Sequence, residues 1–393
     1  MNEMSTTIQN VRSVTPEQLM RELALGEKPF ILDVRNEDEF QQWRIEGKDA
    51  VETLHIPYFD FLEDPEVNIG KVPKGREITV VCAKGGSSEY VAQLLSERGY
   101  QARNLAGGMI AWGNAHQFTE VSMAKEGQPD IVFYQINRFG KGCLSYLIGS
   151  AGEAIVVDPS RHIDQYINLA NEKGLKIKHV FDTHLHADHI SGGAALAERV
   201  GATYHIRMAD AEGARFPYES LRDGQRFDVG NVTLRVIALE TPGHTPGSTT
   251  FLINDKFLLT GDTIFVLGAG RPDLGGQAEP WARDLYRTLF EKLAPLPDDV
   301  WVLPAHFSSA DEQREDGLVT ERLGEIRRTN AVMQSRSEEE FIRSVLASLS
   351  EQPAIYGKIR KANLGWIQAD EDEVTEMELG KNQCAASAIP TGR

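Results

Sequence analysis

Seven side chains of the kinds that bind catalytic metals gather in the second half of the chain. Four fall within T-H-L-H-A-D-H, and three follow in T-P-G-H-T-P-G, L-L-T-G-D and V-L-P-A-H: His184, His186, Asp188, His189, His244, Asp262 and His306. Neutral imidazole and carboxylate are ligands that suit a catalytic first-row metal. The apolar residues Ile177, Val180 and Phe181 predict a buried strand before the first histidine, so a rigid sheet would aim these ligands. The pattern predicts an open catalytic metal centre, since a structural site is closed by four ligands.

Cys82 is a second candidate reactive centre. It ends the apolar run I-T-V-V and is followed by A-K-G-G-S-S, which leads into a helix expected to begin near Ser88. The thiol would face backbone N–H groups and a helix N-terminus, which favour thiolate and can bind an anion above the sulfur. A buried structural cysteine is the plainer alternative. The glycines, the serines and Lys84 argue against it, because a structural cysteine needs no flexible polar loop.

Length and composition describe a soluble, acidic protein with more than one domain. A chain of 393 residues predicts two domains or three, and 41% hydrophobic with 25% charged residues is typical of globular proteins. The net charge of -17 and the lack of a basic cluster exclude nucleic-acid binding. No apolar run approaches the ~18 residues of a membrane span, and residues 1–12 do not resemble a secretory signal. We therefore expect a cytoplasmic protein without membrane association.

The order of apolar segments predicts an α/β protein. Residues 11–118 alternate apolar strands with helices, which is typical of a parallel α/β domain. Residues 119–130 are polar and predict a linker. Closely spaced strands in residues 131–368 predict a mostly antiparallel sheet that carries the ligand loops. Residues 369–393 predict an acidic, mobile tail.

The three cysteines are too few and too widely spaced for a disulfide framework, so each is expected to be a free thiol. Cys143 lies in an expected strand, and we expect it in the core, although its G-C-L-S context allows a position near the metal. Cys384 falls in the expected tail and is assigned no role.

The first domain resembles the rhodanese (sulfurtransferase) family through L-D-V-R followed by E-D-E-F, through C-A-K-G-G-S-S, and through N-L-A-G-G-M-I-A-W. The resemblance implies that Cys82 carries a persulfide and that the loop after it binds sulfite, thiosulfate or the persulfide sulfur: Ala83, Lys84, Gly85, Gly86, Ser87 and Ser88. Asp33 and Arg35 are expected to form an ion pair that anchors the loop. A longer loop would resemble phosphatases, and the short one here favours sulfur transfer.

The second domain resembles the metallo-β-lactamase superfamily, an αββα sandwich, and within it the persulfide dioxygenases that are fused to rhodanese domains. The matching segments are T-H-L-H-A-D-H, G-C-L-S-Y-L-I, T-P-G-H-T-P-G and G-A-G-R-P-D-L. The resemblance implies one Fe(II) per chain bound by His184, His244 and Asp262, with open positions for O₂ and a persulfide. The remaining candidates would orient those ligands or a water, or would hold a second metal: His186, Asp188, His189 and His306.

The residues themselves do not decide whether the site binds one metal ion or two. A dinuclear zinc pair with Asp262 as bridge would make a glyoxalase II-like thioester hydrolase with an accessory rhodanese domain. The attached Cys82 domain favours persulfide chemistry, because both halves would then handle sulfane sulfur. The expected function is Fe(II)-dependent oxidation of a small-thiol persulfide by O₂ to sulfite, coupled to sulfur transfer among thiosulfate, sulfite and thiols. Such an enzyme would serve sulfide detoxification.

Arg271 bears on which thiol carries the persulfide. It is predicted to pair either with a carboxylate of a carrier such as glutathione or with Asp273. Glutathione-using members of the family have Thr where this chain has Pro272, so coenzyme A or another small thiol stays open. The sequence permits a homo-oligomer and does not determine the direction of sulfur transfer.

Overall fold

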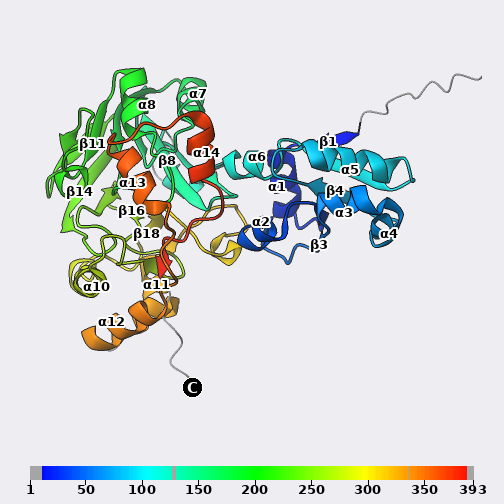
Figure 1. The fold of residues 1–393 in the computed structure, drawn as a ribbon. Coiled ribbons are helices and arrows are strands. Elements are labelled where there is room, and N and C mark those ends of the chain that lie inside the picture. The colour runs from blue at the N-terminus through cyan, green and yellow to red at the C-terminus, as the bar shows by residue number, and fades with distance from the viewer. Residues whose placement is uncertain (1–10, 126–129, 336, 387–393) are drawn as a thin grey trace, which may run out of the picture. The chain divides into compact units, whose positions relative to one another are not determined.

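The computed structural model describes all residues except 1–10, 126–129, 336 and 387–393. The described residues form two compact units, with the main division between residues 117 and 118 (Figure 1). Among the described residues, no helix has both the length and the apolar character that crossing a membrane requires.

The first unit is built on a five-stranded parallel sheet with the order β1-β5-β4-β2-β3. Its strands are β1 (Arg12–Val14), β2 (Phe30–Asp33), β3 (Thr53–His55), β4 (Glu77–Val81) and β5 (Gln101–Leu105). Its helices are α1 (Pro16–Ala24), α2 (Glu37–Gln42), α3 (Tyr58–Glu63), α4 (Pro65–Gly70), α5 (Gly86–Ser96) and α6 (Gly108–Asn114).

Both faces of this sheet are buried. Leu32 and Val80 belong to one apolar cluster, whereas Ile31 and Val81 belong to another. Neighbouring side chains of a strand point to opposite faces, so continuous apolar strands require helices on both sides. The predicted parallel α/β domain is confirmed, and α5 begins at Gly86 rather than near Ser88.

The second unit contains two larger sheets. The first has the order β12-β11-β10-β9-β8-β7-β6. Its strands are β6 (Gln117–Glu120), β7 (Val132–Arg138), β8 (Cys143–Ser150), β9 (Glu153–Val157), β10 (Lys176–Phe181), β11 (Thr203–Ile206) and β12 (Glu219–Ser220). The second has the order β13-β14-β15-β16-β18-β19. Its strands are β13 (Arg226–Val229), β14 (Val232–Glu240), β15 (Thr249–Ile253), β16 (Phe257–Gly261), β18 (Trp301–Pro304) and β19 (Glu321–Arg322).

The two sheets pack face to face, and helices cover their outer sides. Phe181 on β10 meets Phe251 on β15, with ring centroids 5.4 Å apart. Apolar residues of α7 (Asp164–Glu172) and α8 (Gly193–Val200) pack on the first sheet. Residues of α10 (Ala278–Arg287), α11 (Leu323–Thr329) and α12 (Glu338–Ala347) pack on the second (Figure 1). The expected αββα sandwich is therefore present.

Three sequence-based expectations for this unit are corrected. The first sheet is mixed rather than mostly antiparallel, because β9, β10, β11 and β12 run parallel. The expected linker begins inside β6, which extends the sheet edge, and Val121 N donates to Phe133 O at 2.8 Å. Residues 126–129 of that expected linker lie outside the described residues. A strand of four residues flanked by polar sequence is too short to give a clear alternation.

The expected mobile tail is also corrected for residues 369–386, and residues 387–393 lie outside the part of the chain that the structure describes. Residues 371–377 form α14 (Glu371–Met377), whose N-cap Asp370 makes a capping box with Glu373. The adjacent Glu378 is buried and pairs with Arg161 at 2.8 Å. Further on, β20 (Ala385–Ala386) pairs with β17 (Ala269–Gly270). The acidic run is thus a helix with paired carboxylates, which composition alone cannot distinguish from a solvated segment.

Candidate metal centre and sulfur-transfer site

The candidate metal ligands come from the ends of strands in both large sheets. His184 follows β10, His244 lies between β14 and β15, Asp262 directly follows β16, and His306 follows β18. Because the sheets face each other, these strand ends meet at one edge of the sandwich.

Three atoms converge at that edge. Asp262 Oδ2 lies 3.3 Å from His244 Nε2 and 3.8 Å from His184 Nε2. The three side chains are at most 1% exposed. None of these three atoms has a hydrogen-bond partner among the residues that the structure describes. Buried polar atoms are rarely left unpaired, so two imidazole nitrogens and a carboxylate oxygen at one point fit a metal ion.

The hydrogen bonds of the two Nδ1 atoms fix the tautomers of His184 and His244. His244 Nδ1 lies 2.9 Å from Arg271 O, so it must carry the proton that it donates. Thr183 Oγ1 donates its single proton to Asp158 and therefore accepts from His184 Nδ1 at 2.9 Å. Each ring thus presents the lone pair of Nε2 to the common point, which is the form a metal requires.

The charge states of these side chains agree with ligation. Burial lowers the pKa of His184 well below its ordinary value, and His186 and His244 lower it further. Burial also lowers the pKa of His244, although Asp262 opposes this. The pKa of Asp262 is lowered because neighbouring histidines outweigh the effect of its burial. The site therefore holds two neutral imidazoles and one carboxylate, the protonation states of a metal-binding set.

The other candidate ligands form a closed hydrogen-bonded network. His306 lies between two carboxylates, with Nδ1 2.6 Å from Asp262 Oδ1 and Nε2 3.1 Å from Asp188 Oδ2. Asp188 Oδ1 accepts from His189 Nδ1 at 3.0 Å. The Cys143 thiol donates to Asp188 Oδ2 at 3.2 Å and lies 3.7 Å from His189 Nδ1. These groups are hydrogen-bonded to one another, and ligand atoms of Cys143, Asp188, His189 and His306 also lie within 4.8 Å of one another, which is close enough for an ion.

His189 and His306 are charged donors in this network. Burial lowers the pKa of His189, but Asp188 and Cys143 outweigh this and raise it to about 10. Burial also lowers the pKa of His306, and the carboxylates of Asp188 and Asp262 raise it well above its ordinary value. A protonated His306 therefore places a positive charge between two carboxylates.

The predicted Cys82 loop brings one backbone N–H and one hydroxyl to the sulfur. The backbone N–H of Gly85 donates to Cys82 Sγ at 3.0 Å. Ser88 Oγ lies 3.1 Å from the same sulfur and 2.7 Å from Asn104 Oδ1. Cys82 lies where β4 ends and its loop opens α5, so the local chain direction aims amides at the thiol. Such donors suit a sulfur that carries negative charge.

A pocket of about 410 Å³ opens over Cys82. Much of the predicted binding loop lines it: Ala83, Lys84, Gly86 and Ser87. The other lining residues follow β2 or belong to α3: Val34, Arg35, Asn36, Glu39, Tyr58 and Phe59. The pocket gives a small anion or a thiol access to the sulfur.

The expected ion pair and a tight turn lie near the loop. Arg35 Nη2 pairs with Asp33 Oδ2 at 2.6 Å, and both side chains are buried. Arg35 also donates to the carbonyls of Glu39 and Trp43, so the contacts shown for this pair fix the segment that follows β2. Gly108 has φ +60° and lies so close to the Cys82 carbonyl that a Cβ there would be 2.2 Å from its oxygen. Gly108 is thus required by backbone contact, and Gly107 has φ +70° and no room for a Cβ beside Ala111.

Comparison with known proteins agrees with this geometry. Residues 15–115 match the rhodanese-like domain, and residues 138–306 match the metallo-beta-lactamase superfamily. The mitochondrial persulfide dioxygenase ETHE1 of Bos taurus is 32% identical over 185 residues, 44% of this chain and 70% of the relative. The chain belongs to the metallo-beta-lactamase superfamily.

Other relatives of the chain have different activities in their names. A hydroxyacylglutathione hydrolase of Rhizobium etli is 37% identical over 141 residues, 36% of this chain and 52% of the relative. Among solved structures, ETHE1 from Myxococcus xanthus is 32% identical with a TM-score of 0.53, and the match covers 60% of this chain and 98% of that one. The expected combination of a rhodanese-like domain with a metallo-beta-lactamase domain is confirmed.

His186 lies beside both groups, but its ligand atoms face two other carboxylates. Its Nε2 is 3.3 Å from Asp158 Oδ1 and 3.9 Å from Asp182 Oδ1. Neither of its ring nitrogens has a hydrogen-bond partner in the part of the chain that is described. The ring lies 4.3 Å from that of His184 between centroids. Asp158 and Asp182 were not among the predicted site residues, because neither belongs to a ligand motif.

Arg271 is fully engaged by other parts of this domain. Its Nε and Nη2 donate to Asp273 at 2.7 and 2.9 Å, and its remaining contacts are the carbonyls of Gln383 and Ser350. The side chain is 1% exposed. The structure therefore shows the ion pair with Asp273, one of the two partners expected for Arg271.

Two buried groups near the metal ligands escaped sequence reasoning. Asp210 accepts from the backbone N–H of Leu185 and Gly247 at 2.8 and 2.7 Å and from Thr245 Oγ1 at 2.6 Å, so it joins the loops of two ligands. Cys384 is fully buried, and its sulfur lies within 4.8 Å of ligand atoms of Asp262 and His306. No local pattern marks either residue, because both reach the site through long-range contacts.

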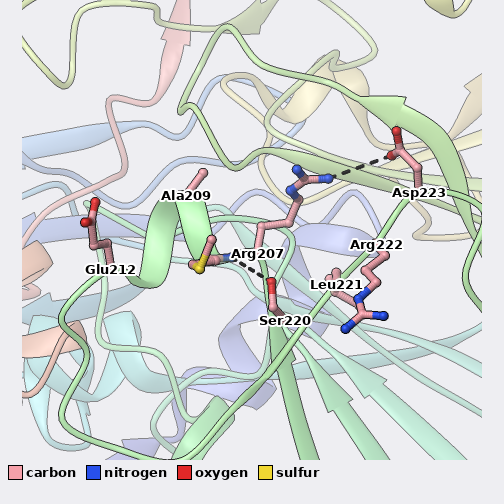
Figure 2. A pocket seen from close by; sticks show the side chains of 8 residues that line it. Arg207, Ala209, Glu212, Ser220, Leu221, Arg222 and Asp223 are labelled. Atoms are coloured by element: carbon pink, nitrogen blue, oxygen red, sulfur yellow. Dashed lines mark hydrogen bonds and ion pairs between the residues drawn. The ribbon is translucent and has the colours of Figure 1, made fainter.

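A second pocket lies away from these residues. It has about 660 Å³ and is lined by Arg207, Met208, Ala209, Glu212, Ser220, Leu221, Arg222 and Asp223. Figure 2 shows Arg207 pointing toward Asp223. The backbone N–H of Met208 donates to Ser220 Oγ at 3.1 Å. None of the predicted site residues lines it.

Proposed function

We propose that the chain is a persulfide dioxygenase with an attached sulfurtransferase. The second domain would oxidise a small-thiol persulfide, and the first would move sulfane sulfur through Cys82. One persulfide R–S–SH, one O₂ and one water give R–SH, sulfite and two protons, so atoms and charge balance. The likeness to ETHE1 over 70% of that protein supports the oxidative activity, and the loop around Cys82 supports the transfer activity.

We propose one metal ion because the three convergent ligand atoms lack hydrogen-bond partners in the described structure, whereas most of the other candidate ligands have them. His184 Nε2, His244 Nε2 and Asp262 Oδ2 are buried without partners within the described residues. Asp188, His189 and His306 are instead bonded to one another or to Cys143. Three ligands on one side of an ion leave positions for substrate and O₂.

Iron(II) held by His184, His244 and Asp262 would supply redox chemistry that zinc lacks, because spin-paired thiolates react slowly with triplet O₂. The protein's own groups set the site. His306 donates to Asp262 Oδ1 and thereby turns Oδ2 toward the imidazoles. Arg271 O and Thr183 Oγ1 hold the two rings in the ligating tautomer. Burial of all these groups excludes bulk water.

A dinuclear zinc hydrolase is the second candidate. The likeness to hydroxyacylglutathione hydrolase favours it, as does His186, whose two buried nitrogens lack hydrogen-bond partners in the described structure. Such an enzyme would use the second set of ligands for another ion and would not consume O₂.

Elemental analysis together with an oxygen electrode separates these functions. We expect about one iron per chain and O₂ uptake that depends on added persulfide. About two tightly bound zinc ions, with hydrolysis of S-lactoylglutathione and no O₂ uptake, would overturn the proposal.

Two substitutions assign the activities to the two domains. Cys82→Ser should abolish thiosulfate:acceptor transfer and leave persulfide-dependent O₂ uptake near normal, because Cys82 is the sulfur carrier. His244→Ala should remove the metal and lower O₂ uptake by at least about a thousandfold, while transfer is spared. Loss of both activities in either variant would contradict the assignment.

A further inference from the structure

The pocket over Cys82 is larger than the small sulfur anions of the proposed transfer reaction require. Its volume is about 410 Å³. One water molecule occupies about 30 Å³ of the liquid, and pockets for small organic ligands measure roughly 300 to 1,000 Å³. Cys82 is only 5% exposed, so a substrate must enter this pocket to reach the sulfur. The space beside the sulfur therefore suits the organic body of a thiol.

An exposed phenyl ring forms part of the pocket wall. Phe59 lines the pocket and is 61% exposed. It lies on α3, whose Phe61 is 1% exposed and belongs to the apolar core of the first unit. Residues two apart on a helix point to different sides, so Phe59 faces away from that core. The ring therefore adds little burial to the fold and offers an apolar surface to a ligand.

Neighbouring aromatic rings hold Phe59 in position. Tyr58 also lines the pocket, and its ring centroid lies 5.6 Å from that of Phe59 and 5.8 Å from that of Tyr90 on α5. Tyr58 is partly buried against the apolar core, and its backbone N–H donates to Val34 O at 2.9 Å. The aromatic wall is thus fixed to the end of β2 and to the helix that follows the reactive loop.

Two side chains of opposite charge also line the pocket. Lys84 lies in the loop after the reactive cysteine, and Glu39 lies on α2. Neither forms an ion pair with another residue that the structure describes. Glu39 Oε2 accepts from the backbone N–H of Asn36 at 3.2 Å, which orients the carboxylate. Arg35 is occupied by Asp33 and by two backbone carbonyls, so Lys84 supplies the available positive charge.

We propose that this pocket selects thiols that carry both an ammonium and a carboxylate group, the class of amino-acid and peptide thiols, as partners of Cys82. This inference rests on the proposed sulfurtransferase function. Phe59 is a specificity-determining residue that packs on the organic body of the thiol. Glu39 pairs with the ammonium group and Lys84 with the carboxylate. A thiol with phosphate groups and no cation would leave Glu39 without a partner and is disfavoured.

The transfer balances without a further reactant. The sulfur of R–SH attacks the terminal sulfur of Cys82–S–SH, a new S–S bond forms, and the S–S bond at Cys82 breaks. The proton of R–SH goes to Cys82 Sγ, so the products are R–S–SH and the free thiol, with no net oxidation or reduction. The backbone N–H of Gly85, 3.0 Å from Cys82 Sγ, stabilises this sulfur as it leaves.

Single-turnover transfer tests the selection. The full-length protein is loaded at Cys82 with thiosulfate, freed of excess donor and mixed with an acceptor thiol. The sulfur that remains on the tryptic peptide containing Cys82 is followed by mass after alkylation. The acceptors are cysteine, N-acetylcysteine without the ammonium group, cysteamine without the carboxylate, and β-mercaptoethanol without either. At equal thiolate concentration, we expect cysteine to react at least about fivefold faster than β-mercaptoethanol.

Two charge variants should show opposite preferences in the same assay. Glu39→Gln should slow transfer to cysteamine about two- to fivefold more than transfer to N-acetylcysteine, because only cysteamine carries the ammonium group. Lys84→Gln should slow transfer to N-acetylcysteine more than transfer to cysteamine. Loading is completed before the acceptor is added, so an effect of Lys84 on thiosulfate binding does not enter the comparison.

The apolar wall is tested by a pair of substitutions on one helix. Phe59→Ala should slow transfer to cysteine about three- to tenfold more than transfer to cyanide, which has no organic body. Leu62→Ala is the matched control, because Leu62 lies on α3, is 46% exposed and is outside the pocket lining. It should change neither rate. Equal losses in the two variants would refute the role of Phe59.

The outcomes separate selection from transfer. Equal rate constants for cysteine and β-mercaptoethanol, or the same loss for every thiol in both charge variants, would overturn the selection and leave the sulfurtransferase function standing. If neither thiosulfate nor glutathione persulfide loads Cys82, the sulfurtransferase function fails and the selection fails with it.

Discussion

The buried histidines show how one residue type takes opposite roles in neighbouring positions. Burial lowers the pKa of His184 and His244, and each is left with a neutral ring whose Nε2 is free to bind a metal. His189 and His306 face the Asp188 carboxylate, which raises their pKa and makes them hydrogen-bond donors. The side-chain environment, rather than the motif spacing, therefore separates ligands from supporting residues.

A histidine away from the metal site gives a prediction about pH. His205 Nε2 lies 3.0 Å from His179 Nδ1, and its ring stacks on Phe181. Burial lowers the pKa of His205 to about 4 from its ordinary value of 6.5. The unfolded chain binds more protons between these values, so stability is fully present above about pH 6.5 and falls as the pH drops toward about 4.

The measurement is urea unfolding of the metal-free protein at several pH values across that window. His205→Phe should flatten the loss of stability on acidification, because it removes the buried titrating group and keeps an aromatic ring. A variant with the same pH dependence as the original protein would contradict this account.

At the level of elements, the site depends on loops that are tied together across the two sheets. Asp210 lies on the short helix α9 (Met208–Ala211) and accepts hydrogen bonds from the loops that carry His184 and His244. These bonds set the distance between the two ligand loops. The pairing of β17 with β20 adds a third constraint, since Gly270 lies against His244 and Asp262.

Asp210→Ala should therefore affect both stability and metal binding. The substitution leaves three buried hydrogen-bond donors without their carboxylate acceptor. We expect this to lower the free energy of unfolding by roughly 3 to 5 kcal/mol. Metal affinity should fall about 10- to 100-fold, as for other residues that orient ligands. Chemical unfolding and metal titration measure the two effects. Asp210→Asn, which keeps one acceptor oxygen, is the matched control, and equal losses in both variants would argue against the hydrogen-bond explanation.

At the level of the whole molecule, each unit has its own apolar core. Separate buried clusters fill the first unit on both faces of its sheet, and others lie under the outer helices of the second. The proposed metal binds within the second unit alone. A ligand that binds the folded state stabilises the unit to which it binds.

Calorimetry should therefore show two unfolding transitions that respond differently to metal removal. Chelation should lower the midpoint of one transition by several degrees, because binding at about a thousand times Kd contributes about 4 kcal/mol. The other transition should stay in place. In the metal-loaded protein, Cys82→Ser should shift only the transition that does not respond to chelation, which assigns that transition to the first unit. A single transition that shifts as a whole would show that the two units do not unfold independently.

The sequence by itself determined the parts of this protein whose chemistry is local. The spacing of T-H-L-H-A-D-H predicted a metal centre, and the turn from strand to helix after Cys82 predicted donors around a thiol, because both depend on a few consecutive residues. The tertiary structure decided the rest. The strand β6 and the ordered segment with Cys384 are held by long-range pairing of short stretches, which no local pattern encodes. The separation of the seven candidate ligands into three convergent unpaired atoms, a hydrogen-bonded network and the unpaired ring of His186 also arises between strands that are distant in sequence, since hydrogen bonding and burial set it.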